Sequence, residues 1–433
     1  MKKTLKSGYK GYKAYQFLEP GVDYTAFELA AEGNEFGEYI IDLTPEQEEF
    51  YEHVIAAHPM ISLHEHPFCF PKHIEQTFDQ VREGRSFTAY RALAESTWDC
   101  VFDNLMDGCC MISSKHGWKW NDVIYDLGMR LADIAHQDFL IKCEKVDDIF
   151  RAKAEGKVAW VPVVEGAAML ENEVDRVDVL YGMGVRLMGI TYSESNGCGS
   201  GLKEKSDGGL TFFGAQVVER MNKVGMAIDA AHVGDKTTMD IIECSKKPIF
   251  ISHTGARALW NSNRLKPDSV MRACADKGGV IGIEAAPHTT ITEKNPTHTI
   301  ESFMEHFEYV KDVVGIDHVT FGPDTLYGDH VGLHHAFAAS LSIKQAFGKK
   351  NADGTTSFPE VPYVRGIENP TEASYNILRW LIKHNYSETD IAKVMGGNTI
   401  RMLRRSGEPL FGSRDFLCVP NRTERRDQHD EKT

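Results

Sequence analysis

Histidine and acidic residues recur in this sequence at the ends of short apolar runs. The run at 60–64 ends in His64-Glu65-His66, and the run at 158–164 is followed by Glu165. Later runs end in the same way at three further residues: His232, His253 and Asp324. Imidazole and carboxylate groups bind first-row metal ions, and a carboxylate that bridges two such ions is one arrangement that activates a water. These residue types therefore predict a metal centre, provided that the chain brings the positions together.

The two histidines at the first run are the most specific signal. Residues two apart on a strand point to the same face, so His64 and His66 can bind one ion together. A single histidine after an apolar strand is more often a packing or capping residue than a ligand. Five matching positions together favour a metal centre over a polar interior that needs no ion.

Eight short apolar or β-branched runs alternate with helical stretches along the chain, and such runs are typical of parallel strands buried on both faces. They lie at residues 60–64, 108–113, 158–164, 185–191, 225–231, 248–253, 279–284 and 318–322. The alternation predicts an α/β fold, a (β/α)8 TIM barrel, in which the carboxyl ends of the strands meet at one mouth. The sequence contains neither GxGxxG nor GxxxxGK[ST], which excludes the common nucleotide-binding loops.

One barrel domain with additions is expected. Residues 1–43 are predicted to form an N-terminal extension packed on the barrel, residues 44–415 the metal-dependent barrel, and residues 416–433 a charged tail. The motif Thr44-Pro45-Glu46-Gln47 is typical of a helix N-terminus with a capping box. The insertion at 325–370 is expected to lie over the active face.

Composition and charge restrict the partners of the chain. Its 433 residues include 48 Lys and Arg against 63 Asp and Glu, a formal charge of −15, which argues against binding to nucleic acid or to an anionic membrane surface. No apolar run reaches the roughly 18 residues of a membrane span, and the N-terminus lacks the apolar stretch of a signal peptide. Nine cysteines without a CxxC pair suit a reducing compartment. We therefore expect a cytoplasmic protein that binds neither nucleic acid nor a membrane.

Ordered motifs in residues 60–405 resemble the membrane dipeptidase family (renal dipeptidase, peptidase M19) of the amidohydrolase superfamily. Residues 209–232 are similar to the family pattern GLT.FG…MNRLGM.IDLSH, and residues 251–259 are similar to SHSxARAL. Residues 278–283 are similar to the family pattern GGVIGV, and Gly396-Gly397-Asn398 with Arg401 match its closing GGNxxRV. The resemblance covers about four-fifths of the chain.

The resemblance implies a (β/α)8 barrel with two zinc ions. Five ligands would hold them: His64 and His66 on one ion, His232 and His253 on the other, and Glu165 between them. A metal-bridging hydroxide would attack an amide carbonyl, Asp324 would manage the proton passed to the leaving nitrogen, and Arg264 would bind a substrate carboxylate. These roles agree with general chemistry, because two cations lower the pKa of bound water and an arginine fork suits a carboxylate. The alternative role of Arg264 is an ordinary salt bridge. Family members often form dimers, so the resemblance also implies a homodimer.

The chain departs from the family pattern at three positions near the predicted site. The first motif is His64-Glu65-His66 instead of His-x-Asp, which removes about one negative charge from the ligands of that ion. Tyr192 aligns with a substrate-contacting histidine on strand 4, and residues 324–328 keep Asp324 but lose the second acid of Asp-Phe-Asp-Gly. The Tyr192 phenol could donate a hydrogen bond to a developing oxyanion, or its ring could only pack at the mouth.

Three hypotheses about function follow. The first is a binuclear zinc-dependent hydrolase that cleaves a dipeptide or a small carboxylated amide. The second is another reaction of the superfamily, such as lactam or N-acyl hydrolysis or decarboxylation, which His66 and Tyr192 would allow. The third is a metal-stabilised scaffold without activity, which is disfavoured because a scaffold has no need of a proton-transfer acid such as Asp324.

Overall fold

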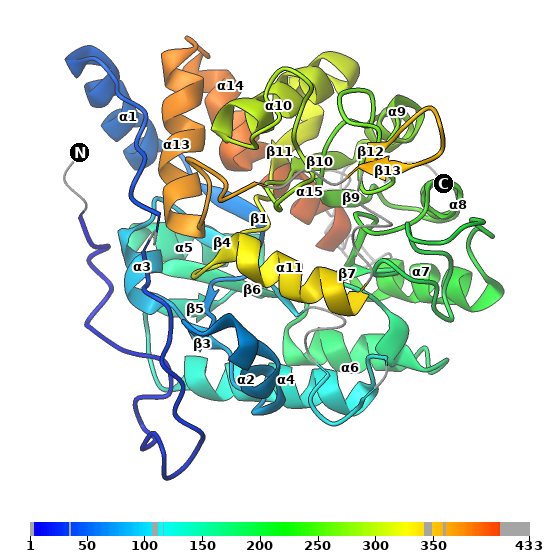
Figure 1. The fold of residues 1–433 in the computed structure, drawn as a ribbon, viewed down its shortest axis with the longest axis horizontal. Helices are drawn as coiled ribbons and strands as arrows, with labels where there is room; N and C mark the ends of the chain where they lie inside the picture. Colours follow the sequence, from blue (N-terminus) through cyan, green and yellow to red (C-terminus); the bar gives the residue numbers. More distant parts are fainter. Residues whose placement is uncertain are drawn as a thin grey trace, which may run out of the picture.

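Eight parallel strands of this computed structural model follow one another in chain order around a nearly closed barrel (Figure 1). They are β1 Ile61–Glu65, β4 Cys100–Leu105, β6 Val158–Val164, β7 Leu187–Gly189, β8 Ala227–Asp229, β9 Phe250–Thr254, β10 Val280–Ile283 and β11 Val319–Phe321. The structure describes residues 4–33, 36–105, 111–115, 117–341, 349–357 and 361–407. The chain-order arrangement of the eight parallel strands confirms the predicted (β/α)8 barrel. The predicted tail at 416–433 lies outside the described residues.

The first and last strands meet through the segments that follow them. The backbone N–H of Asp324 donates to the carbonyl of His64 at 3.0 Å, and the N–H of His66 donates to the carbonyl of Thr325 at 2.9 Å. These two bonds join the end of β1 to the chain after β11. Three predicted site residues therefore lie on the seam of the barrel.

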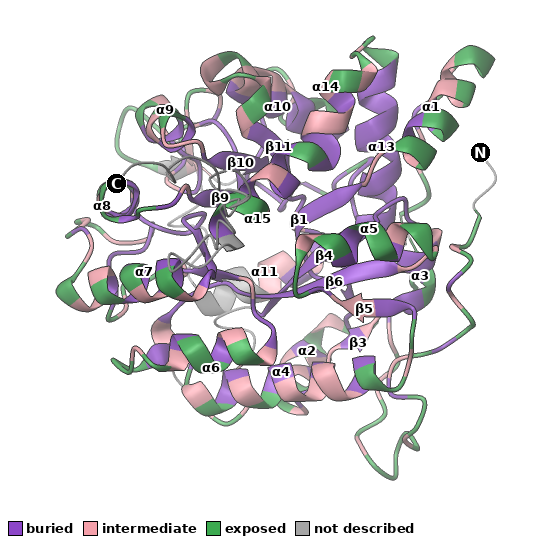
Figure 2. Ribbon diagram, turned by 180° about the vertical axis from the view of Figure 1, so that it is seen from behind, coloured by how far each residue is buried: buried purple, intermediate pink, exposed green. Residues whose placement is uncertain are grey.

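Helices surround the strands, with buried faces toward the barrel and exposed faces outward (Figure 2). The longer ones are α1 Pro45–Ala57, α4 Trp120–Ala135, α5 Val146–Ala154, α6 Arg176–Met183, α7 Phe212–Val224, α8 Asp235–Cys244, α9 Asp268–Asp276, α10 Ile300–Val314, α11 His330–Leu341, α13 Pro370–Lys383 and α15 Asn398–Gly407. Shorter elements are β2 Phe68–Cys69, α2 Thr77–Arg82, β3 Phe87–Thr88, α3 Tyr90–Glu95, β5 Leu140–Lys142, β12 Lys349–Lys350, β13 Thr356–Ser357 and α14 Glu388–Ala392. In Figures 1 and 2, α11 and α15 lie on opposite sides of the strands.

The helix that the Thr44 motif predicts is confirmed. Thr44 caps α1 by accepting from the backbone N–H of Gln47, and the Gln47 side chain accepts in return from the N–H of Thr44. This reciprocal pair satisfies two backbone donors that a helix N-terminus otherwise leaves open.

The second strand lies earlier than the sequence predicts. The run at 108–113 falls largely outside the described residues, and its described part, residues 111–113, is not in a strand. The strand is instead β4, in which the polar residues Asp103 and Asn104 interrupt the apolar run that would have identified it in the sequence. Asp103 is buried because the indole of Trp160 donates to it at 2.8 Å and the guanidinium of Arg130 forms an ion pair with it. A buried carboxylate with such partners is stable inside a barrel wall.

The N-terminal segment is anchored on α4 by one buried carboxylate. Asp133 accepts from the hydroxyls of Tyr12 and Tyr90 and from the backbone N–H of Tyr15, each at 2.7 Å. Tyr12 and Tyr15 are both buried. The segment before α1 is therefore attached to the barrel by polar contacts as well as by its aromatic rings.

Tyr12→Phe is expected to lower the free energy of unfolding by about 1.5–3 kcal/mol, because hydrogen bonds to charged groups contribute about this much. Urea denaturation measures the change. Tyr125→Phe is the control, since Tyr125 is 48% exposed. Equal effects of the two substitutions would contradict an anchoring role for the Asp133 contact.

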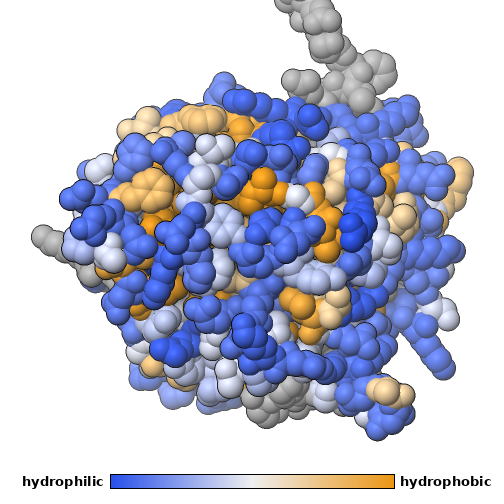
Figure 3. Space-filling view, turned by 90° about the horizontal axis from the view of Figure 1, so that it is seen from above, coloured by the Kyte–Doolittle hydropathy of each residue, from blue (hydrophilic) through white to orange (hydrophobic). Residues whose placement is uncertain are grey.

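The outer surface agrees with the acidic, polar composition. On the face in Figure 3, hydrophilic side chains predominate and apolar ones occur in small patches. Among the described residues, no helix is both long enough and apolar enough to cross a membrane.

Candidate metal centre

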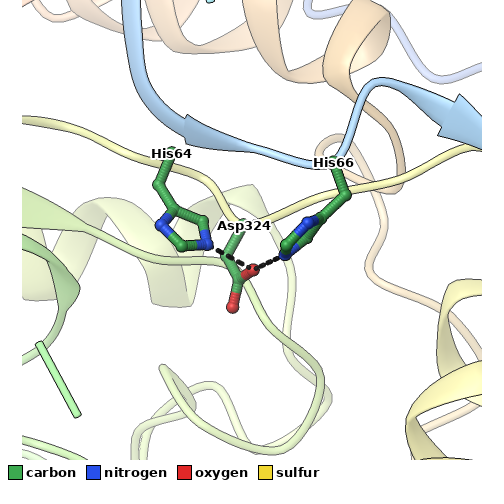
Figure 4. A group of neighbouring side chains, drawn as sticks. All are labelled: His64, His66 and Asp324. Carbon is green, nitrogen blue, oxygen red and sulfur yellow. Dashed lines mark hydrogen bonds and ion pairs between the residues drawn. The ribbon is translucent and has the colours of Figure 1, made fainter. Parts of the chain in front are cut away.

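The barrel brings the predicted metal ligands to one place at the carboxyl ends of the strands. The Oε1 atom of Glu165, directly after β6, lies near the Nε2 atoms of three histidines: His232 at 3.0 Å, His253 at 3.2 Å and His64 at 3.5 Å. The Oδ1 atom of Asp324 lies 3.2 Å from Nε2 of His64 and 3.1 Å from Nε2 of His66 (Figure 4). His64 thus faces both carboxylates.

The donor set fits divalent metal ions. Ligand atoms of His64, His66 and Asp324 lie within 4.8 Å of one another, and so do those of His64, Glu165 and His253. Both ring nitrogens of His64 are buried, and apart from the two facing carboxylates they have no polar partner among the described residues. Buried polar atoms are normally satisfied, so a cation at this position would supply what the His64 ring lacks.

Three of the imidazole rings are held by their Nδ1 atoms. Nδ1 of His66 lies 3.2 Å from the carbonyl of Asn104, Nδ1 of His232 lies 3.2 Å from the hydroxyl of Ser193, and Nδ1 of His253 lies 2.8 Å from the hydroxyl of Ser252. Such contacts fix the orientation of a metal-binding ring and leave Nε2 for the ion. In all three rings, Nε2 is the atom closest to the carboxylates.

Burial keeps the rings of His64, His232 and His253 in the neutral form that binds metals. It lowers the pKa of His64 to about 4, against the opposing charge of Asp324, and it lowers the pKa of His232 and His253 well below the usual value. Burial also acts to raise the pKa of Asp324, but His64 and His253 hold it well below its ordinary value. At neutral pH the imidazoles of His64, His232 and His253 are therefore neutral, and Asp324 is ionised.

Glu65 lies between two predicted ligands but points away from them. Its carboxylate accepts from the hydroxyl of Ser62 at 2.9 Å and from the N–H and hydroxyl of Thr325 at 3.0 and 2.6 Å. Alternation along the strand explains this opposite direction. Thr325 follows Asp324, whose φ of 59° is unusual for a residue other than glycine. Glu65 therefore helps to hold the backbone that presents Asp324.

Tyr192 lies beside the centre, three residues beyond the end of β7. Its ring stacks on the His232 imidazole, with centroids 4.3 Å apart and an angle of 21° between the planes. This contact alone is compatible with either interpretation of Tyr192, packing or hydrogen bonding to a reacting group.

Arg264 is buried behind His253 and already has a carboxylate partner. Its Nη1 donates to the carbonyl of His253 at 3.1 Å, and its Nη2 forms an ion pair with Glu284. Glu284, His253 and Asp324 have ligand atoms within 4.8 Å of one another. Burial raises the pKa of Glu284, while Arg264 acts to lower it.

Sequence reasoning missed Glu284, although a signal was present. Glu284 directly follows β10, as Glu165 follows β6, but it was counted as the last residue of an apolar run. Acidic residues at the carboxyl ends of barrel strands face the mouth of the barrel, and this rule identifies Glu284 as a candidate site residue.

Additional histidines lie on the α11 side of the centre. The ring of His288, which is fully buried, stacks on His334 of α11 with centroids 5.7 Å apart and lies 5.1 Å from the ring of His335. The φ of His288 is 69°, a strained conformation that is typical of functional regions. Burial lowers the pKa of His334 to about 3. The charge of Asp324 acts to raise this pKa, and the charge of Arg264 acts to lower it. The insertion thus contributes α11 to the surroundings of the metal centre.

Comparisons with known proteins are consistent with this geometry. The family model for membrane dipeptidase (peptidase family M19) matches residues 52–345. Dipeptidase tcpJ of Claviceps purpurea is 27% identical over 297 residues, covering 68% of this chain and 61% of the relative. Dipeptidase 3 of Homo sapiens is 25% identical over 260 residues, covering 58% of this chain and 45% of the relative. The chain thus spans between about half and three-fifths of the length of these relatives.

Solved structures share the fold. An amidohydrolase from Pseudomonas aeruginosa superposes with a TM-score of 0.63 at 25% identity, covering 82% of this chain and 99% of the other. A metallo peptidase from Rhodobacter sphaeroides, liganded with a phosphinate mimic of the dipeptide L-Ala-D-Ala, gives a TM-score of 0.60 at 17% identity, covering 80% and 99%. The second likeness bears on the fold alone.

Proposed function

Because this chain belongs to the membrane dipeptidase family, peptidase family M19, we propose that it is a metal-dependent hydrolase that cleaves the amide bond of a dipeptide or a related small carboxylated amide. The observation that carries the proposal is the convergence of Glu165 and Asp324 on inward-pointing Nε2 atoms. Such a donor set has no evident purpose in a barrel that only needs to fold.

In the proposed mechanism, His64 and His66 would hold one metal ion and His232 and His253 another, with Glu165 available as a ligand to both. Bound ions, most suitably Zn2+, would supply the Lewis acidity that lowers the pKa of a water and polarises the scissile carbonyl. Asp324 stays ionised at neutral pH, so it can accept a proton and pass it to the leaving nitrogen. Arg264 binds the carboxylate of the substrate through its planar fork.

The test is a substrate panel assayed with added Zn2+: L,L- and L,D-dipeptides, N-acyl amino acids and lactams. Hydrolysis of dipeptides supports the proposal. Hydrolysis of only N-acyl compounds or lactams would favour the second reaction class, and no turnover of any substrate by metal-loaded protein would favour the scaffold.

Arg264→Met is expected to lower kcat/KM about 10- to 100-fold for substrates with a carboxylate next to the scissile amide, which is the usual contribution of a charged hydrogen bond. The esterified analogues should lose much less. Steady-state kinetics on both substrates measures the difference, with thermal unfolding recorded because Glu284 loses its buried partner.

Arg257→Met is the matched control, since Arg257 bonds to Asp235 at 3.0 Å and is not among the predicted site residues. It should change the acid and ester rates equally. Equal losses in Arg264→Met would assign Arg264 a structural role.

A further inference from the structure

Glu284 and Arg264 form a buried ion pair at the edge of the metal centre. Their side chains are 0% and 1% exposed, and the pair joins Oε2 of Glu284 to Nη2 of Arg264. Arg264 is also fixed by its bond to the carbonyl of His253 at 3.1 Å. A charge buried this deeply is costly without a partner, so each side chain keeps the other in place while no substrate is bound.

Glu284 has unused acceptor capacity. Its Oε1 atom is buried and has no hydrogen-bond partner among the described residues. Its carboxylate also belongs to the group whose ligand atoms, together with those of His253 and Asp324, lie within 4.8 Å of one another. Two carboxylates this close repel each other, so the space beside them favours a cation that donates hydrogen bonds.

An ammonium group suits this position better than another metal ion. A dication on Glu284 would lie against the Arg264 guanidinium, whereas an ammonium carries one charge and three donors. A dipeptide has such a group at one end and a carboxylate at the other. Its two charges match the two members of the buried pair.

We propose that Glu284 binds the α-ammonium group of the substrate while Arg264 binds its carboxylate, so that a zwitterionic substrate replaces the internal ion pair with two of its own. This inference rests on the proposed function. A substrate with only one of the two charges opens the pair and leaves one buried charge without a partner. The site thus selects small amides with both termini free.

The experiment uses the full-length, metal-loaded protein and four forms of one dipeptide: free, N-acetylated, C-amidated and blocked at both ends. N-acetylation is expected to lower kcat/KM of the unmodified protein about 10- to 100-fold, because it removes a charge-assisted bond. This comparison does not depend on any variant.

Glu284→Gln is expected to lower kcat/KM for the free dipeptide about 10- to 100-fold. The rate for the N-acetylated dipeptide should stay unchanged or rise, because Arg264 no longer has a competing carboxylate. Metal content should be unchanged. Asp126→Asn is the matched control: it removes a carboxylate that is buried against Arg130, 3.1 Å away, and should leave the ratios among the four substrates unchanged.

Several results would overturn the inference. One is equal turnover of free and N-acetylated dipeptide by the unmodified protein. Another is an equal loss on all four substrates in Glu284→Gln. A loss of bound metal in that variant would make Glu284 a metal ligand instead. If no form of any dipeptide is hydrolysed while N-acyl amino acids or lactams are, it is the proposed function that fails.

Discussion

Replacing His232 or His253 with alanine is expected to abolish turnover and lower the metal content while the barrel still folds. Both Nε2 atoms lie within 3.2 Å of Oε1 of Glu165, so each substitution removes a ligand at the proposed bridging carboxylate. The loss should exceed about 1000-fold, because removing even an outer partner of a metal ligand typically costs 10–100-fold. Elemental analysis and kinetics on the same preparation measure the two effects.

Two further variants serve for comparison, one with an intermediate expected loss of activity and one with none. Ser252→Ala removes the hydroxyl 2.8 Å from Nδ1 of His253 and should cost about 10–100-fold with partial metal loss. His318→Ala removes a histidine that bonds to the carbonyl of Gly279, directly before β10, and it should keep normal metal content and activity. Full activity with normal metal in either His232→Ala or His253→Ala would remove that residue from the ligand set.

The barrel and the positions of the proposed ligands could be predicted because one rule generates both. Parallel strands buried on both faces give continuous apolar runs, and their carboxyl ends must converge. A polar residue at such an end is therefore placed in space by its position in sequence. This reasoning held for β6 and Glu165, where seven apolar residues end in a single acid.

The rule fails where a strand contains satisfied polar groups. Asp103 and Asn104 interrupt β4, and only the structure shows that Arg130 and Trp160 satisfy Asp103. β5 was missed because it has three residues, one of them a lysine, and pairs only with β6. The hydropathy of a single strand does not show which distant side chains or neighbouring strands its residues contact.

Contacts between neighbouring strand ends were also beyond sequence reasoning. Arg264 could be assigned a carboxylate partner, but nothing in the spacing shows that Glu284, twenty residues later, already occupies that role in the free protein. His288 lies in a loop with a positive φ, and its contact with His334 depends on how α11 crosses the barrel. Arg264 and Glu284 are the residues proposed to select the substrate, whereas the proposed metal ligands would act in the reaction itself.

The role of Tyr192 decides how the reaction is assisted. Its ring stacks on His232, and phenylalanine would keep that contact, so Tyr192→Phe isolates the hydroxyl. If the hydroxyl donates to the tetrahedral intermediate, kcat and kcat/KM should fall together by about 100- to 1000-fold, the usual effect of losing one oxyanion donor. If Tyr192 only packs, kcat should stay within about a factor of three, because little volume changes.

We expect Tyr192→Phe to be impaired with its metal content unchanged, and Tyr192→His to gain little dipeptidase activity. The imidazole would restore a group that can carry a positive charge, but residues 324–328 also differ from the family pattern, so one substitution should not rebuild the family's pocket. Kinetics of both variants on free dipeptides, with metal analysis, provides the test. A large gain in Tyr192→His would show that the rest of the pocket already suits ordinary dipeptides. Unchanged kcat in Tyr192→Phe would instead leave polarisation of the carbonyl to the metal ions, with Tyr192 serving to hold the His232 ring in place.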